Sequence, residues 1–115
     1  MPDKGRSGED KAVLFLENKG LEIICRNFRS RSGEIDIVAL DGETLAFIEV
    51  KTWSVLGIEA LEYGIDKRKQ RRIIETAKYF LSDHRKYRYM AIRFDVIFIA
   101  PDSVTHLESA FMERV

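Results

Sequence analysis

The stretch GEIDIVALDGETLAFIEVK, residues 33–51, has the pattern of a β-hairpin made of two apolar strands. The Asp-Gly dipeptide near its middle is typical of the tight turn that joins two antiparallel strands. Three charged residues, Asp36, Glu49 and Lys51, interrupt the apolar runs. Because a buried charge is unfavourable unless it has a partner, these residues are the first candidates for a functional site.

The length of the turn decides which face of the hairpin each charge occupies, because successive side chains on a strand point to opposite faces. A two-residue turn pairs Leu40 with Glu43, and a four-residue turn pairs Leu40 with Leu45. Both place Asp36 on the face that carries the other two charges, whereas a regular three-residue turn would place it behind the sheet. Asp-Gly favours the two-residue turn, so we expect all three charges on one face. The opposite face is then apolar throughout and consists of Ile35, Ile37, Ala39, Ile48 and Val50.

The residues before the hairpin predict a helix and a strand. Residues 1–6 have no regular pattern and are expected to be a loose start. Ser7 and Asp10 form a capping-box pattern, so the helix should begin at Ser7 and continue up to Gly20, which ends it. The apolar and β-branched run at 21–28 predicts the first strand of a sheet.

The residues after the hairpin predict one clear helix and one clear strand. Residues 53–65 show no clean period and are interpreted as a loop. Asp66 is a good N-cap, and the apolar residues that follow it repeat with helical spacing. The run 91–100 has strand character and stops at Pro101, and residues 103–111 are either a last short strand or a turn.

These elements follow the order helix, three strands, helix and one or two strands, with the hairpin strands at about 33–40 and 45–52. This order is typical of the α/β class, with a mixed central sheet flanked by helices. At 115 residues the chain is expected to form a single domain, residues 1–115.

Charge is segregated along the chain although the net charge is zero. The acidic hairpin lies between a basic segment that contains Arg26, Arg29 and Arg31 and a second basic segment at 65–93. Cys25 is the only cysteine, which excludes a disulfide framework and a thiolate metal cluster. There is no secretory signal and no apolar run of about 18 residues, so we expect a soluble, cytoplasmic protein without a membrane partner.

The acids of the hairpin face a problem of charge. Two carboxylates on an apolar face repel each other, which raises their pKa values unless a cation lies between them. Lys51 supplies one cation, and carboxylate oxygens without sulfur or imidazole suit a second cation such as Mg²⁺ or Mn²⁺. The simpler interpretation is a cross-strand salt bridge on a half-exposed sheet. The apolar opposite face makes the hairpin central, which favours the metal hypothesis.

Further residues could join this site. Glu9 lies in the first turn of the first helix, where it either only favours the helix dipole or points inward with the apolar stripe. Glu34 shares the face of Asp36 and ranks below it. Trp53 and Tyr63 border the loop and either stack on an unpaired base or pack over the core.

The second helix begins with a run of cations that oppose the helix dipole. Because this placement lowers helix stability, phosphate binding is favoured over a merely solvated face. His84 and His106 lack the spacing of a metal site and are expected at the surface. Asp95 interrupts an apolar strand and is expected to bond to Arg93 or to another basic residue, with its role left open. The basic run consists of Lys67, Arg68, Lys69, Arg71 and Arg72.

On these residues the chain resembles the YraN-like family of bacterial proteins, within the PD-(D/E)XK superfamily of restriction-endonuclease-like and Holliday-junction-resolvase-like nucleases. The likeness covers nearly the whole chain, through GED, CRNFRSRSGEIDIVALDG, LAFIEVKT, KRKQRRI and RFDVIFI. It implies the αβββαβ core of that superfamily, which agrees with the order of elements above. Ile35 stands where the superfamily motif has proline, and Trp53 stands where many relatives carry a basic residue.

The resemblance also implies roles for individual residues. Asp36 resembles the first acid of the motif, Glu49 the second acid and Lys51 the lysine. Glu9 matches an acid that is often found on the first helix. The backbone carbonyl of Val50 would be a metal ligand together with the two motif acids.

We therefore predict a Mg²⁺-dependent or Mn²⁺-dependent nuclease that hydrolyses phosphodiester bonds of DNA, with branched or repair intermediates as candidate substrates. The alternative is a non-catalytic nucleic-acid-binding module of the same fold, and a third hypothesis is a structural protein with a salt-bridged hairpin. A branched substrate would require a twofold homodimer. The residues expected to bind nucleic acid are Arg29, Arg31, Lys67, Gln70 and Arg71.

Overall fold

The computed structural model of the chain describes residues 4–52 and 65–113. The described elements alternate in the predicted order, so the α/β fold class is confirmed. They are α1 (Lys4–Asn18), β1 (Glu22–Ser30), β2 (Gly33–Asp41), β3 (Thr44–Thr52), α3 (Lys67–Asp83), the short 3-10 helix η1 (Arg85–Tyr87), β4 (Ala91–Ala100) and β5 (Ser103–Phe111). The last segment, for which a strand and a turn were both open, is the strand β5.

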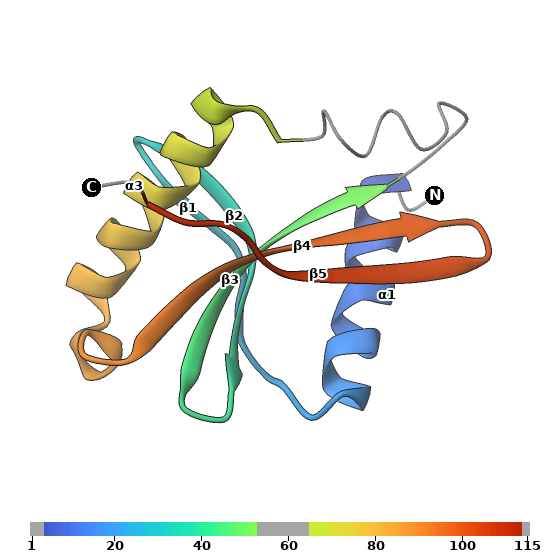
Figure 1. Cartoon of the computed structure of the whole chain (residues 1–115), viewed down its shortest axis with the longest axis horizontal. Coiled ribbons are helices and arrows are strands. Elements are labelled where there is room, and N and C mark those ends of the chain that lie inside the picture. Colours follow the sequence, from blue (N-terminus) through green and yellow to red (C-terminus); the bar gives the residue numbers. More distant parts are fainter. Residues whose placement is uncertain (1–3, 53–64, 114–115) are drawn as a thin grey trace.

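The strands form one mixed sheet in the order β1-β2-β3-β4-β5. Strands β3 and β4 are parallel, with α3 between them in the chain, and all other neighbours are antiparallel. The helices α1 and α3 lie on opposite faces of the sheet (Figure 1). The N-terminal ends of both helices lie on the same side of the molecule as the C-terminal end of β3, at the top of Figure 1. This arrangement is compatible with an αβββαβ core.

Each face of the sheet has its own hydrophobic core, because alternate residues of the central strands point to opposite faces. On the α3 side, Phe47 and Phe94 from neighbouring strands pack with Phe80 of the helix. On the α1 side, Leu16 of the helix packs with apolar residues of β2, β3 and β4, among them Ile48. The central strand β3 is therefore buried on both faces.

The turn of the central hairpin differs from the predicted one. Asp41 pairs with Thr44 and Leu40 pairs with Leu45, so the two-residue turn is Gly42-Glu43. The predicted pairing of Leu40 with Glu43 is wrong because Gly42, with φ of 61°, occupies the first turn position, where a left-handed backbone is required. The two registers differ by two residues, so the side chains in the paired part of the hairpin, from Ile37 to Ile48, keep their predicted faces.

Two further predictions are corrected. Helix α1 begins at Lys4, so Ser7 lies inside the helix rather than capping it, and residues 4–6 are not a loose start. Ile35 packs in the α3-side core with Val38, and not with Ile37. The pairing of β2 with β3 ends at Ile37, so the residues before it do not follow the expected alternation of faces.

Other predicted boundaries are confirmed. Helix α1 ends before Gly20, whose φ is +96°, and Asp66 caps α3 by accepting a hydrogen bond from the backbone N–H of Lys69. Trp53 and Tyr63, with residues 53–64 of the predicted loop, lie outside the described residues. In the described part of the chain, no helix has the length and apolar character needed to cross a membrane.

Candidate active site

The candidate site lies where β2 separates from β3. The two strands pair from the turn as far as Ile37 and Ile48. At the next position, Asp36 accepts a hydrogen bond from the backbone N–H of Val50 at 2.8 Å through its Oδ2. A side-chain carboxylate thus bonds to the backbone of β3 beyond the last paired residues. This bond fixes Asp36 next to the C-terminal part of β3, where the other two charges of the hairpin lie.

Glu49 is the second acid of the site. Only 7% of its surface is exposed, although it carries a carboxylate. Its Oε1 forms an ion pair with Nζ of Lys69 at 2.7 Å. Because Lys69 belongs to α3, this contact connects the C-terminal part of β3 to the N-terminal turn of the helix. Glu49 therefore faces α3, on the same side of the sheet as Phe47.

The pKa of Asp36 is raised to about 7. Burial is the largest cause, the neighbouring charge of Glu49 adds to it, and the hydrogen bond from Val50 opposes both. The charges of Glu9 and Glu34 raise the pKa further. Asp36 thus lies among three other acids, and the described residues provide too little positive charge to keep it ionised well below neutral pH.

Glu9 reaches this group of acids from α1. Burial raises its pKa, and the charge of Arg26 lowers it only in part. The guanidinium of Arg26 lies 3.9 Å from Glu9 but only 2.7 Å from Asp10, to which it also donates a hydrogen bond. In the described part of the chain, Oε1 of Glu9 is buried and has no hydrogen-bond partner. The sequence left open whether Glu9 only favours the helix dipole or points inward, and in the structure its side chain points inward.

Glu34 occupies the periphery of the same group. It is half-buried, and its Oε2 accepts a hydrogen bond from Nε of Arg29 at 3.2 Å. Glu34 therefore has its own counterion at the rim, whereas Glu9 shares Arg26 with Asp10 at the longer distance of 3.9 Å, and no ion pair of Asp36 is found among the described residues.

Two lysines complete the site. Burial lowers the pKa of Lys51, and the neighbouring Lys69 ammonium lowers it further. For Lys69 itself, burial acts to lower the pKa, but the bond to Glu49 outweighs it and the pKa is raised. The two ammonium groups are thus unequal: Lys69 is firmly protonated, while Lys51 loses its proton more easily than an exposed lysine.

Lys69 is a site residue that the sequence analysis placed only in a basic run. A signal for its role was present in the spacing. Lys69 precedes Ile73 by four residues, so it lies on the helical stripe that faces the sheet. A cation on that stripe, one turn before the first buried residue, points toward the end of the neighbouring strand.

The donor atoms fit a hard divalent cation. Asp36 is half-buried beside the buried Glu49, and burial together with the charge of Glu49 raises the pKa of Asp36, so a bound cation would stabilise its ionised form. Within residues 4–52 and 65–113, no group of three His, Cys, Asp or Glu side chains is arranged to hold an ion. Mg²⁺ does not need such a group, because proteins commonly bind it through one or two carboxylates together with water and phosphate. Asp36 and Glu49, with the Val50 carbonyl, are the residues available for this purpose.

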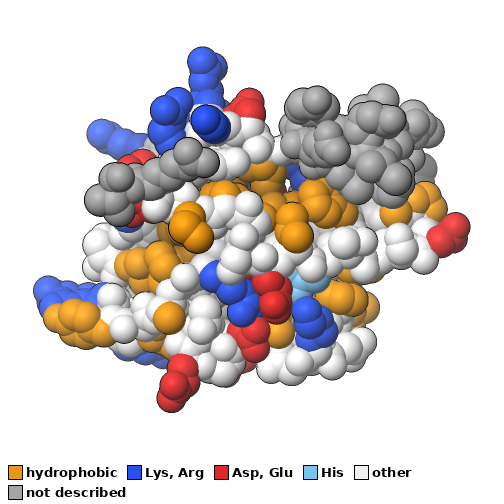
Figure 2. Space-filling view, in the orientation of Figure 1, with side chains coloured by type: hydrophobic (Ala, Val, Ile, Leu, Met, Phe, Trp, Pro, Cys, Tyr) orange, Lys and Arg blue, Asp and Glu red, His pale blue; other side chains and the backbone are white. Residues whose placement is uncertain are grey.

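The predicted phosphate-binding residues lie on two surfaces. Lys67, Gln70 and Arg71 lie on the N-terminal half of α3, where Lys and Arg side chains gather at the upper edge of the molecule (Figure 2). Lys67 and Arg71 are exposed, and no ion pair is recorded for either within the described ranges. Arg31 is exposed in the turn between β1 and β2, whereas Arg29 is engaged by Glu34.

A second buried acid lies on the other face of the sheet, away from this site. Asp95 is fully buried and accepts hydrogen bonds from Arg93, from Nε2 of His106 and from the backbone N–H of Ser109. Burial alone would raise its pKa, but these bonds hold the pKa below its usual value. The predicted bond to Arg93 is confirmed. The prediction that His106 lies at the surface is wrong, since only 2% of its side chain is exposed. The ring is held inside because it bonds to Asp95 through Nε2 and to Lys19 through Nδ1.

His84 also departs from its predicted place at the surface. Its ring is half-buried and stacks on Phe80 with centroids 4.0 Å apart. Nδ1 of His84 lies 2.9 Å from the backbone carbonyl of Phe80. Apolar packing against the end of α3 therefore covers this ring.

Comparison with known proteins gives a consistent family. A model of uncharacterised protein family UPF0102 matches residues 8–99, a range that includes every acid and lysine of the candidate site. A UPF0102 protein of Persephonella marina is 44% identical over 108 residues, which cover 94% of this chain and 92% of the relative. A UPF0102 protein of Treponema denticola is 43% identical across 96% of both chains. A UPF0102 protein of Alcanivorax borkumensis is 41% identical across 86% of this chain and 79% of the relative.

Proposed function

The chain belongs to uncharacterised protein family UPF0102, and we propose that it is a divalent-metal-dependent nuclease that hydrolyses phosphodiester bonds of DNA. The observation that carries the proposal is the pair Asp36 and Glu49. The two acids are held together at the end of β3, and the pKa of Asp36 is raised to about 7 by burial and by Glu49. A half-buried acid and a buried acid that repel each other are unfavourable for folding unless a cation binds them. The resemblance to PD-(D/E)XK nucleases, stated above, supports the same role.

Asp36 and Glu49 would hold Mg²⁺ or Mn²⁺, and the Val50 carbonyl would be a further ligand. A bound ion of this kind polarises the phosphate and lowers the pKa of the attacking water. The hydrogen bond from Val50 N–H fixes the direction of the Asp36 carboxylate before any ion binds. Such preorganisation avoids reorientation of the ligand during the reaction.

Lys51 and Glu9 act beside these ligands. Burial and the neighbouring Lys69 lower the pKa of Lys51, so its amine would exchange a proton with the attacking water or with the phosphate oxygen more readily than an exposed lysine would. Glu9, whose buried Oε1 has no hydrogen-bond partner among the described residues, accepts a hydrogen bond from water in the outer shell of the site. Lys69 holds Glu49 in place and keeps the side chain from turning away.

The basic surface would bind the nucleic acid backbone. Lys67 and Arg71 lie one helical turn apart in the first two turns of α3, and Lys69 from the same end of the helix is bonded to Glu49, so phosphates that bind this end of α3 would lie on the same side of the molecule as the candidate site. Arg31 adds a second contact on the turn between β1 and β2. Contacts of this kind give affinity that depends on salt concentration rather than on base sequence.

One observation favours the alternative of a non-catalytic nucleic-acid-binding module. Glu49 is already paired with Lys69 at 2.7 Å, and Lys51 lies in the same group of charges. Two lysines could neutralise two acids without any metal. In that case the basic surface would bind nucleic acid, and the acids would serve only the fold.

Purified protein incubated with labelled DNA separates the two functions. Single strands, duplexes, flaps and four-way junctions are each tested with Mg²⁺, Mn²⁺ or EDTA, with the same strands in RNA as a second series. We expect cleavage with a divalent ion, and we expect Glu49→Gln to lower the rate by more than about a hundredfold. The matched control is Glu43→Gln, which removes an exposed carboxylate in the turn at the other end of β3.

Three results distinguish the hypotheses. Cleavage that is equal in Glu49→Gln and wild type would mean that a contaminating nuclease is responsible, and the proposal would be wrong. Binding without cleavage in any divalent ion would establish the non-catalytic module. Loss of cleavage in Glu49→Gln but not in Glu43→Gln would support the proposal.

A further inference from the structure

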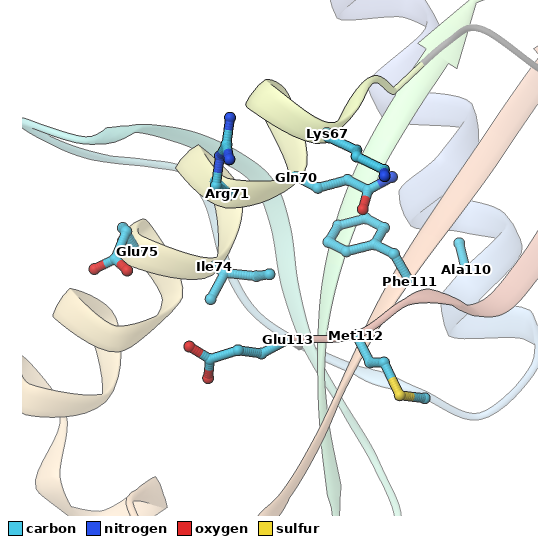
Figure 3. A pocket seen from close by; sticks show the side chains of 9 residues that line it. All are labelled: Lys67, Gln70, Arg71, Ile74, Glu75, Ala110, Phe111, Met112 and Glu113. Atoms are coloured by element: carbon cyan, nitrogen blue, oxygen red, sulfur yellow. The ribbon is translucent and has the colours of Figure 1, made fainter. Parts of the chain in front are cut away.

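A pocket of about 640 Å³ lies between the N-terminal half of α3 and the C-terminal end of β5 (Figure 3). The helix lines it with residues between Lys67 and Glu75, and the other wall runs from Ala110 to Glu113. The volume is in the range of sites that bind small molecules or single nucleotides. None of the groups assigned above to metal binding or proton transfer lines it.

Phe111, which lines the pocket, is the last of three stacked aromatic rings in the sheet. Phe47, Phe94 and Phe111 are cross-strand partners on β3, β4 and β5. The Phe47 and Phe94 rings lie 5.6 Å apart and inclined by 26°, and the Phe94 and Phe111 rings lie 5.1 Å apart and inclined by 15°. Strand β5 is the edge of the sheet, so no further described strand continues the row. The pocket begins at Phe111, where a fourth planar ring would extend the stack.

The charges around the pocket are arranged unevenly. Lys67 and Gln70 extend toward the Phe111 ring, while Glu75 and Glu113 lie at the other end (Figure 3). Both acids are paired with Lys78, at 3.6 Å for Glu75 and 2.6 Å for Glu113. Neither Lys67 nor Arg71 forms an ion pair within residues 4–52 and 65–113, and Lys67 is the one that extends toward Phe111, so it gives this end of the pocket a positive charge that the described residues do not neutralise.

The pocket also adjoins the candidate active site. Gln70 lines the pocket, and the preceding residue, Lys69, is bonded to Glu49. The first turn of α3 therefore contributes Gln70 to the pocket and Lys69 to the candidate site, so a strand bound along this end of the helix could reach both.

We propose that this pocket receives one unpaired base of a single-stranded segment, which stacks on Phe111 while Lys67 and Arg71 contact the adjoining phosphates. A nucleotide offers a planar base beside an anionic phosphate, which is complementary to the open end of the aromatic row at Phe111 and to the neighbouring Lys67. This inference rests on the proposed function for its substrate class and specifies it: the substrate has an unpaired nucleotide next to the cleavage position. Stacking on an aromatic residue tolerates any base, so no sequence preference is expected from it.

The test measures binding without cleavage. Single-stranded DNA is titrated with full-length protein in EDTA, using a series of strands in which 2-aminopurine or an abasic residue occupies each position in turn. We expect one position at which 2-aminopurine fluorescence is quenched and at which the abasic residue weakens binding about tenfold. Phe111→Leu removes the ring but keeps an apolar side chain, and it should remove both effects and leave the salt dependence of binding unchanged.

Two other variants complete the design. Leu107→Ala is the matched control, because Leu107 is an apolar residue of the same strand, 50% exposed, and does not line the pocket. Ala110→Trp fills the pocket from a different residue and should weaken binding as Phe111→Leu does. It keeps the proposal testable if Phe111→Leu fails to fold, as judged by circular dichroism.

The outcomes separate this inference from the proposed function. Cleavage by wild type together with equal binding by Phe111→Leu and Ala110→Trp would overturn the inference and leave the nuclease standing. Position-dependent quenching without cleavage in any divalent ion would support the inference and overturn the nuclease. Binding of an apolar peptide at the pocket, unaffected by oligonucleotide, would also overturn the inference.

Discussion

Asp36 and Asp95 are both acids inside apolar strands, yet their surroundings are opposite. Asp95 has Arg93, His106 and the backbone N–H of Ser109 as hydrogen-bond donors, and its pKa is lowered. Asp36 has one recorded hydrogen bond, from Val50, and its pKa is raised to about 7, chiefly by burial and by Glu49. The charge of Asp95 is therefore compensated by the described residues, and the charge of Asp36 is not.

The difference indicates which buried acid serves the fold and which serves a ligand. Asp95 connects β4 to the irregular part of β5, where Ser109 has φ of 52° and the strand pairing shifts. Its donors come from the chain, so the group is complete without any further molecule. Asp36 is instead surrounded by acids, and an added cation would stabilise it. Perturbed pKa values of this second kind are typical of functional sites.

The largest expected effect concerns the satisfied acid. Asp95→Ala removes one partner of a buried ion pair and leaves Arg93 and His106 without it, so we expect the free energy of unfolding to fall by about 3–5 kcal/mol. Urea unfolding followed by circular dichroism measures this change. Asp102→Ala, an exposed acid in the turn between β4 and β5, is the control and should be neutral. A loss below about 1 kcal/mol would mean that the Asp95 network does not support the fold.

The second prediction concerns Asp36, where removal of the charge should raise the free energy of unfolding instead of lowering it. Because the pKa of Asp36 is about 7 in the folded protein and 3.8 as its ordinary value, the folded state binds more protons between these pH values. Stability from this group is therefore present below pH 4 and is lost as the pH rises through 7. Asp36→Asn keeps an acceptor for Val50 N–H and removes the charge. We expect it to stabilise the protein at pH 8 by about 2–4 kcal/mol and to have little effect at pH 4.

Thermal unfolding at pH 4, 6 and 8 in EDTA measures this dependence. Asp102→Asn serves as the control, because it removes an exposed charge and should shift the unfolding temperature equally little at each pH. If Asp36→Asn were destabilising at pH 8, the carboxylate would have partners beyond the described ones, and the contrast with Asp95 would be lost.

The sequence was sufficient for the positions that periodicity and turn parity determine. Alternation along the strands placed Asp36, Glu49 and Lys51 together, and the error in the turn did no harm because the two registers differ by two residues. The sequence was insufficient where tertiary contacts decide. Burial of His106 depends on Asp95 of the neighbouring strand, and the face of Ile35 depends on where the pairing of β2 with β3 stops.

The third prediction concerns the cation that Asp36 lacks. Mg²⁺ that binds the folded protein only should raise its stability by about 1–3 kcal/mol at 10 to 100 times the dissociation constant. Because Asp36 must lose its proton to bind the ion, binding should be about tenfold weaker at pH 6 than at pH 8. Calorimetry and thermal unfolding with Mg²⁺ test this in wild type, Asp36→Asn and Glu49→Gln. An equal shift in all three proteins would place the ion elsewhere.

The smallest expected effect shows whether Lys69 competes with Mg²⁺ for Glu49 or orients Glu49 as a ligand. Lys69 is half-buried and holds Glu49 at 2.7 Å, so a cation that binds Glu49 must share this carboxylate with the ammonium group. The Lys69 side chain is still 39% exposed, so its ion pair is partly screened by solvent and contributes about 1 kcal/mol or less, and Lys69→Met should strengthen Mg²⁺ binding by no more than about fivefold. Lys67→Met, on the same helix turn but exposed, should leave Mg²⁺ binding unchanged.

Lys69→Met should also raise the pKa of Lys51, because it removes the like charge that lowers this pKa. NMR titration of the lysine side chains measures the shift. If Mg²⁺ binding were instead weakened in Lys69→Met, the lysine would be orienting Glu49 as a ligand, and the acid pair would depend on α3 in the way that Asp95 depends on Arg93.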